Sequence, residues 1–376
     1  MSQFFGSPAL DRIANDLREA FAGLGAQPID TEEVQPLTPY LEFLGEFFRD
    51  TLVEYTAHGQ DEYCLRPDIT LAIALRLANG TLKSGRYGYD DLVFRGARRA
   101  RRGDAESFAP LQRQIGIEVF GEDGGDAELL LHTIQALKSA GAGALQIVVS
   151  DVALVHEVID GFTLHANWKQ RLKRTVSTPS AFGRVLASAQ GASDSPSALA
   201  SALSGLTEKA ARDAVEEVFT MTGLKQIGSR SLADVTDRLV AKAAEASEPL
   251  TADDAARLSD VMAIEGPLGT ALEQFAGMLR APGATARLDT LSGFARVLED
   301  GGLSPDTVRF DADLSRHLSY YDGFVFEIFD ASGERFLAGG GRYDGLVSAL
   351  SGGAVDLPAI GAMVRPDRVF AIAGED

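Results

Sequence analysis

The sequence is poor in residues that form disulfides or hold metals. It contains one cysteine, Cys64, which excludes an intramolecular disulfide and a cysteine-cluster zinc site. Its five histidines form no HExxH or similar pairing, so we predict no metal site. Cys64 lies between apolar and charged residues, and we interpret it as a small buried side chain.

The sequence also lacks a long apolar run and an excess of positive charge. No stretch of about 18 apolar residues is present, so we predict no membrane span. The N-terminal residues 1–21 lack the form of a signal peptide, which predicts a cytoplasmic protein. The formal net charge of −19 argues against a nucleic-acid partner, because phosphate binding depends on Lys and Arg. A local basic patch would still allow a nucleic-acid partner to bind.

A chain of 376 residues predicts two domains, or one domain with a large insertion. Apolar alternation predicts strands in the first 164 residues and again after residue 300, with helical periodicity between them. We therefore predict an α+β fold, in which helices flank an antiparallel sheet. The sheet domain is formed by residues 1–164 and 301–376, and residues 165–300 form a mainly helical insertion.

One predicted strand, RQIGIEVFG at residues 113–121, carries a polar notch. Alternate side chains of a strand share a face, so Gln114, Gly116 and Glu118 point the same way. An amide and a carboxylate beside a bare glycine suit a small zwitterionic ligand with an amino group or a ring N–H. The alternative is an exposed edge of the sheet with ordinary polar residues.

Three consecutive glycines, Gly339 to Gly341, follow another predicted strand in FLAGGGRYDGL. Their spacing matches neither a phosphate loop nor a dinucleotide-binding fingerprint. Glycine within a sheet allows close approach of a ligand or of a neighbouring backbone. A loop that requires positive φ is the alternative.

Arginine and tyrosine gather in two segments. The run RGARRARRGD at residues 95–104 is either a solvated loop or a site for phosphate or an acidic partner surface. In SRHLSYYDGFVFE at residues 315–327, an arginine and two tyrosines precede an apolar run typical of a buried strand. No Ser-His-Asp or Cys-His arrangement is recognisable. The residues alone predict a ligand-binding domain without catalytic residues.

Five motifs, met in the family's order, resemble the histidyl-tRNA synthetases and cover most of the chain outside residues 165–300. They are CLRPDIT (64–70), RQIGIEVFGEDGGDAELL (113–130), LSRHLSYYDGFVFE (314–327), GGGRYDGLV (339–347) and IGAMVRPDRV (360–369). The second and fifth resemble the second and third class II synthetase motifs, and the third resembles the family's histidine-binding signature. The resemblance implies a class II aminoacyl-tRNA synthetase-like core.

The resemblance also implies a pocket for L-histidine. The implied ligand-binding residues are Asp68, Thr70, Arg95, Gln114, Glu118, Arg316, Tyr320 and Tyr321. The α-amino group would meet Asp68, Thr70 and Gln114, and the imidazole would meet Glu118 and Tyr321. Tyr320 would line the pocket, Arg316 would lie near the carboxylate, and Arg95 resembles the second-motif arginine. No catalytic residue, metal or cofactor is implied.

The sequence departs from the synthetase pattern at its catalytic positions. His317 and Ser319 replace a glycine and an aspartate of the histidine signature, and Arg365 replaces the third-motif glycine that leaves room for ATP. Arg368 retains the closing arginine of that motif. No anticodon-binding domain is expected after it. Histidine recognition is therefore expected to be kept, while ATP and tRNA binding are expected to be lost.

This combination resembles the synthetase paralogues that serve as regulatory subunits of ATP phosphoribosyltransferase, the first enzyme of histidine biosynthesis. The resemblance implies a subunit without activity of its own that activates a short-form catalytic subunit and takes part in feedback inhibition by L-histidine. It implies a self-dimer within a hetero-octamer, with no nucleic-acid or membrane partner. One alternative is an active or truncated synthetase-like enzyme that forms histidyl-adenylate. Others are an assembly scaffold with a vestigial pocket and an enzyme for a different acyl transfer.

Overall fold

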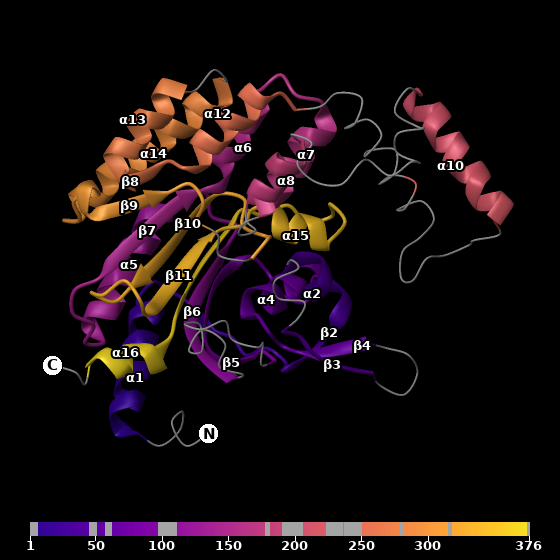
Figure 1. The fold of residues 1–376 in the computed structure, drawn as a ribbon. Coiled ribbons are helices and arrows are strands. Elements are labelled where there is room, and N and C mark those ends of the chain that lie inside the picture. Colours follow the sequence, from indigo (N-terminus) through magenta and orange to yellow (C-terminus); the bar gives the residue numbers. More distant parts are fainter. Residues whose placement is uncertain are drawn as a thin grey trace.

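The computed structural model describes residues 7–44, 51–56, 62–96, 111–176, 181–189, 206–222, 236, 250–278, 282–314 and 318–373. Its centre is a nine-stranded sheet covered by helices on both faces (Figure 1). In spatial order the strands are β1 (Gln27–Pro28), β5 (Gly85–Phe94), β6 (Leu111–Phe120), β12 (Ala359–Val364), β11 (Phe336–Arg342), β10 (Phe324–Phe329), β7 (Gln146–Asp151), β9 (Val308–Asp311) and β8 (Glu265–Pro267).

The predicted antiparallel sheet is confirmed from β5 through to β7, where every neighbouring pair runs antiparallel. The sheet is mixed at its ends, because β1 pairs in parallel with β5 and β9 pairs in parallel with β7. These parallel pairs were not predicted. They join segments far apart in the sequence, which no local pattern reports.

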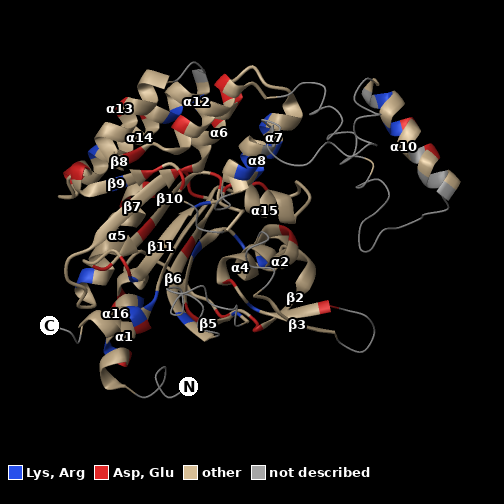
Figure 2. Ribbon diagram, in the orientation of Figure 1, with Lys and Arg blue, Asp and Glu red and all other residues tan. Residues whose placement is uncertain are grey.

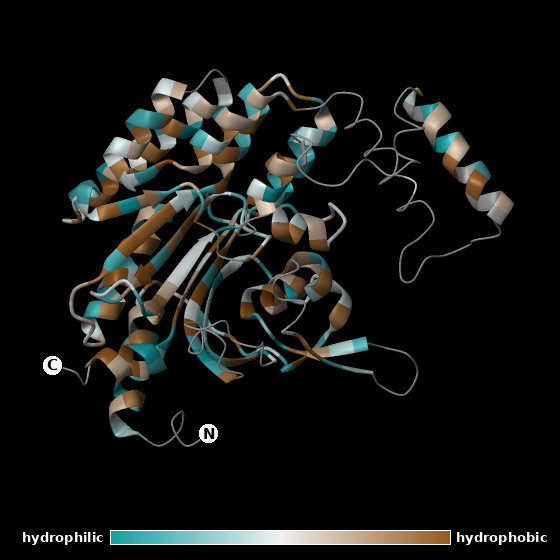
Figure 3. Ribbon diagram, viewed as in Figure 1, coloured by the Kyte–Doolittle hydropathy of each residue, from teal (hydrophilic) through white to brown (hydrophobic). Residues whose placement is uncertain are grey.

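Two layers of helices bury the two faces of this sheet. One hydrophobic cluster lies under α1 (Pro8–Ala22), α5 (Asp126–Ser139), α13 (Leu268–Met278), α14 (Pro282–Asp300) and α16 (Pro366–Ala373). The second lies under α2 (Leu37–Phe43), α4 (Ile69–Ala78), α7 (Ala166–Val176), α8 (Ala181–Ala189) and α15 (Gly345–Leu350). The helices α6 (Val152–Asp160) and α12 (Ala252–Met262) contribute to both clusters. In Figure 3 the helices alternate between hydrophobic and hydrophilic residues along their length.

Two helices follow directly from local sequence. Leu10, Ile13, Leu17 and Phe21 are buried along one side of α1, at the spacing of an amphipathic helix. Helix α4 begins after Asp68, whose carboxylate accepts a hydrogen bond from the Leu71 N–H at 2.8 Å. Asp68 is therefore the N-cap of α4.

Residues 165–300 are mainly helical where the structure describes them, and α10 (Glu208–Thr222) is a further helix of this range. Two features of this range differ from those expected of a separate helical insertion. The short strand β8 extends the main sheet, and the apolar residues of α13 and α14 belong to the same core as α5. The 3-10 helix η1 (Pro305–Thr307) then leads into β9.

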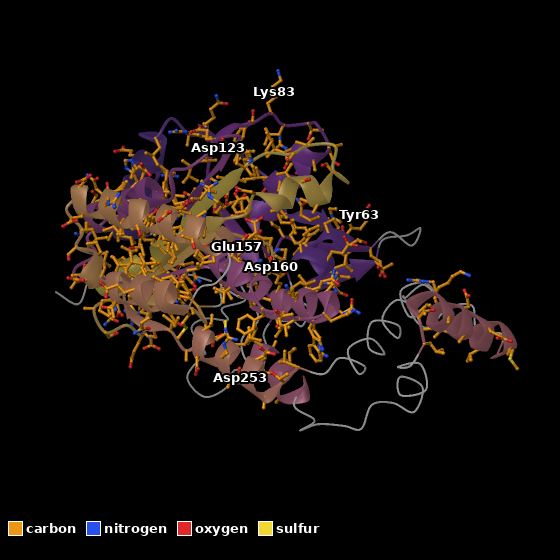
Figure 4. The ribbon with its side chains drawn as sticks, turned by 90° about the horizontal axis from the view of Figure 1, so that it is seen from above. Tyr63, Lys83, Asp123, Glu157, Asp160 and Asp253 are labelled. Carbon is orange, nitrogen blue, oxygen red and sulfur yellow. The ribbon has the colours of Figure 1, made fainter. Side chains whose placement is uncertain are left out.

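A small second sheet is formed by β2 (Val34–Pro36), β4 (Glu62–Leu65) and β3 (Val53–Thr56). Its pairing places six apolar side chains on one face, namely Val34, Pro36, Val53, Tyr55, Tyr63 and Leu65. This face reaches solvent: Tyr55 is 44% exposed, and its ring stacks on that of Tyr63, which lies at the periphery in Figure 4. Cys64 points to the opposite face and is fully buried, as predicted.

Helix α7 is a basic element in an acidic chain (Figure 2). Most of its cations are engaged within the protein. Lys173 pairs with Asp160, Lys169 donates to the Asp160 carbonyl at 2.7 Å, and the Arg171 guanidinium lies 5.3 Å from the Trp168 ring centroid. The helix therefore offers less positive charge to a partner than its composition indicates.

A buried ion pair ties α14 to the sheet. The Arg287 Nε donates to Asp151 Oδ1 at 2.9 Å, and its Nη2 reaches Oδ2 of the same carboxylate. Asp151 is completely buried at the end of β7 and also accepts from the Leu154 N–H, which caps α6. The Asp151 carboxylate thus caps α6 and fixes the position of α14.

Replacing Arg287 by Met is expected to destabilise the protein by about 3–5 kcal/mol, because Asp151 would be left as an uncompensated buried charge. Urea unfolding measures the change. The control is Arg309→Met, which removes an exposed pair with Glu265 and is expected to cost less than about 1 kcal/mol. Equal losses in the two variants would contradict a special role for the buried pair.

Candidate functional site

The polar notch predicted on β6 lies in the middle of the main sheet. Glu118 is opposite Tyr87 of β5 and Gly361 of β12, and Gly116 is opposite Tyr89 and Met363. Glu118 is 1% exposed and Gln114 is 4% exposed. The alternative of an exposed sheet edge is therefore wrong, because β6 is flanked by strands on both sides.

Glycines form the floor beneath this notch. A Cβ atom at Gly361 would lie 1.7 Å from Glu118 Oε2, and one at Gly116 would lie 2.5 Å from the Tyr89 hydroxyl. At Gly341 it would lie 2.9 Å from the Tyr321 ring. Gly339 to Gly341 lie inside β11, and none of the three has positive φ. Close approach is therefore the reason for these glycines, and the loop alternative is wrong.

Hydroxyl groups surround the Glu118 carboxyl group. Thr70 Oγ1 donates to Glu118 Oε1 at 2.6 Å, the Tyr343 hydroxyl donates to Oε2, and the Tyr89 hydroxyl makes a longer contact of 3.5 Å with Oε1. Burial raises the pKa of Glu118 to about 8, against the hydrogen bonds from Thr70 and Tyr343, which lower it. A neutral carboxyl group is thus favoured near pH 7. Such a group can bind a ring N–H and can also ionise beside a cation.

The second polar group of the site is the Asp68 carboxylate, at the beginning of α4. Asp68 Oδ2 accepts a hydrogen bond from the Tyr320 hydroxyl at 3.2 Å. The Tyr320 ring centroid is 4.8 Å from that of Tyr321 and 5.6 Å from that of Tyr343. This aromatic cluster links the Asp68 end of the site to the Glu118 end.

Gln114 lies on the Glu118 face of β6 and is buried there. Its side-chain amide carries both donor and acceptor groups, which suit a polar ligand on this face of the sheet.

The structure brings six of the eight predicted ligand-binding residues to one side of the sheet, namely Asp68, Thr70, Gln114, Glu118, Tyr320 and Tyr321. Arg95 is half-buried beside them, and its Nε donates to the Pro67 carbonyl at 3.3 Å. Arg316 lies outside the described residues, as do His317 and residues 97–104 of the basic run.

Sequence reasoning missed two tyrosines of the site. Tyr343 lies in the motif that was noted for its glycines, and alternation continued from Gly339 and Gly341 places it on the Glu118 face. Tyr89 was not noticed, because only the register of β5 against β6 places it opposite Gly116. A long-range pairing of this kind leaves no local signal.

The two third-motif arginines are engaged inside the protein. Arg365 is buried and forms a two-pronged ion pair with Asp367, with Nε–Oδ1 at 3.0 Å and Nη2–Oδ2 at 2.8 Å. Arg368 donates to the Phe336 carbonyl at 3.0 Å. Among the described residues, no group of three His, Cys, Asp or Glu side chains could hold a metal ion, and no helix there is long and apolar enough to cross a membrane.

Comparison with known proteins agrees with this geometry. A family model described as histidyl-tRNA synthetase matches residues 8–226 and 213–369. The regulatory subunit of ATP phosphoribosyltransferase from Agrobacterium fabrum is 30% identical over 98% of this chain and 99% of its own. The chain belongs to the histidyl-tRNA synthetase family, in the group of ATP phosphoribosyltransferase regulatory subunits. The subunit of that name from Allorhizobium ampelinum is also 30% identical, over 95% of this chain and 96% of its own.

Solved structures confirm the class II synthetase fold of this regulatory-subunit relative. A Bacillus halodurans protein titled an ATP phosphoribosyltransferase regulatory subunit/histidyl-tRNA synthetase superposes with a TM-score of 0.67 at 20% identity, over 97% of this chain and 79% of its own. A histidine–tRNA ligase subunit from Alicyclobacillus acidocaldarius gives 0.59 at 22% identity, over 99% and 96%. The predicted family and fold class are therefore confirmed.

The buried Glu118 predicts a distinctive pH dependence of stability. Its pKa is raised from 4.5 to about 8 on folding, so the native state holds a proton that the unfolded state has released. Stability should therefore fall as pH rises from about 5 to 8, by at most about 1.4 kcal/mol per pH unit from this group. Glu118→Gln should remove this component.

Urea unfolding of both proteins between pH 5 and 8 tests this expectation, because other titrating groups are common to both and cancel in the difference. The stability of the wild type relative to Glu118→Gln should decline as pH rises. A difference that is constant with pH would show that Glu118 titrates near its ordinary value.

Proposed function

We propose that this chain is a non-catalytic regulatory subunit of ATP phosphoribosyltransferase that binds L-histidine on the Glu118 face of the sheet. It activates a short-form catalytic subunit in the cytoplasm and takes part in feedback inhibition by histidine. The observation that carries the proposal is a buried carboxyl group, Glu118, held by the hydroxyls of Thr70 and Tyr343 on the same strand face as Gln114. The curated relatives are named ATP phosphoribosyltransferase regulatory subunit, which supports the choice of this enzyme as the regulated partner.

The pocket suits the two ends of histidine. Asp68 is the proposed anionic acceptor for the α-ammonium group. Thr70 donates to Glu118, and Gln114 lies on the Glu118 face of β6. The Glu118 carboxyl group can accept from an imidazole N–H, or ionise against an imidazolium cation. Arg95 and Arg316 are the proposed partners on the carboxylate side.

Regulation then follows from linkage. If histidine binds one conformation of the assembly more tightly than another, it shifts the population toward that conformation and changes the activity of the catalytic partner. The apolar face of the small sheet supports assembly with other subunits, because exposed apolar clusters of this kind mark protein interfaces. The proposed assembly is a self-dimer within a hetero-octamer, without nucleic acid.

The ion pair between Arg365 and Asp367 supports the absence of synthetase activity. A guanidinium group occupies the position where the synthetase motif has a glycine, and its two hydrogen bonds to Asp367 hold it in the protein interior. Alternation along β12 puts Arg365 on the same side as Gly361 and Met363, the side of the proposed histidine pocket. The volume of its side chain there opposes the binding of ATP next to histidine.

Mixing the chain with a short-form catalytic subunit should raise the rate of phosphoribosyl-ATP formation, and added histidine should lower it again. The chain alone should form no product. Glu118→Gln should still activate, because the variant changes the pocket and not the assembly, but its inhibition should require at least about tenfold more histidine. No increase in rate on mixing would refute the regulatory role.

The second candidate, a synthetase-like enzyme, is favoured by the match to the histidyl-tRNA synthetase family and predicts histidine-dependent exchange between ATP and pyrophosphate. We expect no exchange from the wild type, because Arg365 occupies the ATP side. Arg365→Gly should bind histidine as the wild type does. Exchange by the purified wild type would overturn the regulatory proposal in favour of the enzyme.

A further inference from the structure

The Glu118 carboxyl group is buried without a cation beside it. Among the described residues its hydrogen-bond partners are the hydroxyls of Thr70, Tyr343 and Tyr89, and no Lys, Arg or His side chain there pairs with it. A buried carboxylate that lacks a cation is costly, because neutral hydroxyls do not compensate its charge. The ligand-free protein therefore favours the protonated acid, whose proton a basic ligand can take.

Two hydroxyls from distant parts of the chain hold this carboxyl group, each by a different oxygen. Thr70 Oγ1 donates to Glu118 Oε1 at 2.6 Å, and the Tyr343 hydroxyl donates to Oε2. Oε2 also lies close to Gly361, where a Cβ atom would approach it to 1.7 Å. The orientation of the carboxyl group is therefore fixed, and Oε2 keeps a second lone pair for a ligand.

The Tyr343 side chain is itself fixed in the core. It is completely buried, and its backbone N–H donates to the Ala359 carbonyl at 2.8 Å. Its ring packs edge-on against those of Phe120 and Tyr320, with centroids 6.0 and 5.6 Å away. A ring packed in this way has little freedom to move its hydroxyl. Tyr343 is thus suited to fix the position of Glu118 before a ligand binds.

We infer that Tyr343 is a positioning residue of the histidine site, and that its hydroxyl holds Glu118 so that the carboxyl group and the ligand ring share one proton. This inference rests on the proposed histidine site. A carboxylic acid beside neutral imidazole and a carboxylate beside imidazolium hold the same single proton, so either form of the buried pair has no net charge. A second proton, or none, would leave a buried charge without a partner.

Several other groups face Glu118 from the elements packed around it. The titratable ones are Asp68, Tyr87, Tyr89, Tyr320 and Tyr343, and Gly361 faces it from β12. Burial holds the pKa values of Tyr320 and Tyr343 well above their usual range, so both hydroxyls keep their protons. The pKa of Glu118, raised by burial to about 8, lies where histidine binding can be measured.

Calorimetric titration of the full chain with L-histidine, from about pH 5.5 to about pH 9, measures the shared proton. Wild-type affinity should be highest between about pH 6.5 and 8, and should fall on either side by up to about tenfold per pH unit. Below this range the free imidazole is protonated, so binding must release a proton. Above it Glu118 is ionised, so binding must take a proton up.

Tyr343→Phe should bind histidine about 3- to 10-fold more weakly near pH 7, the equivalent of one hydrogen bond. Its loss of affinity on the alkaline side should begin at a higher pH than in the wild type, because the removed hydrogen bond favours ionised Glu118. The α-amino group of histidine also titrates there, but equally for both proteins. A purely structural role of Tyr343 would lower the affinity by the same factor at every pH.

The matched control is Tyr87→Phe. Tyr87 lies opposite Glu118 on β5, but its hydroxyl donates to the Lys83 carbonyl at 2.6 Å. This control should keep both the histidine affinity and the shape of the pH profile. Thr70→Val is a second variant, which removes the hydrogen bond to Oε1 and should shift the alkaline side in the same direction as Tyr343→Phe.

Parallel pH profiles of the wild type and Tyr343→Phe would overturn the positioning role of Tyr343, as would an equal shift in Tyr87→Phe. If Tyr343→Phe does not fold, a parallel profile of Thr70→Val would overturn the inference instead. A wild-type affinity that stays constant from about pH 7 to about pH 8.5 would overturn the shared proton. If the wild type binds no histidine at any pH, the proposed function itself is refuted.

Discussion

The burial of the Glu118 carboxyl group in the centre of the sheet is the constraint on which the site depends. A carboxyl group in that position must be hydrogen-bonded, and the surrounding hydroxyls of Thr70 and Tyr343 meet this requirement. It also needs space, which explains why Gly361 can carry no side chain. The sequence motifs that contain Thr70, Glu118, Tyr343 and Gly361 therefore all contribute to the burial of this one carboxyl group.

Polar groups differ in how completely the protein pairs them. The buried Tyr40 hydroxyl has no hydrogen-bond partner among the described residues, and the hydrogen bond from Tyr320 to Asp68 is long, at 3.2 Å. At the third motif the situation is reversed, because Arg365 and Asp367 satisfy each other inside the protein. Polar groups that are already paired have little to gain from a ligand, whereas unpaired ones gain the most.

Much of the site was predictable, because its signals are local. Alternation along β6 correctly placed Gln114 and Glu118 on one face, and Asp68 caps the apolar helix that directly follows it in the sequence. The parallel pairs at the sheet ends, the strand β8 and the contacts of Tyr89 were not predictable in this way. Each depends on the pairing of segments that are distant in the sequence.

By itself the sequence determined the family, the central strands and helices, and the polar residues of the candidate site, because periodicity, capping and motif order depend on neighbouring residues. Only the tertiary structure decided that Glu118 is buried and its pKa raised, that Arg287 joins α14 to Asp151, and that the Tyr40 hydroxyl is unpaired. Burial and pairing are properties of what surrounds a side chain. Those surroundings come from strands and helices that meet only when the chain is folded.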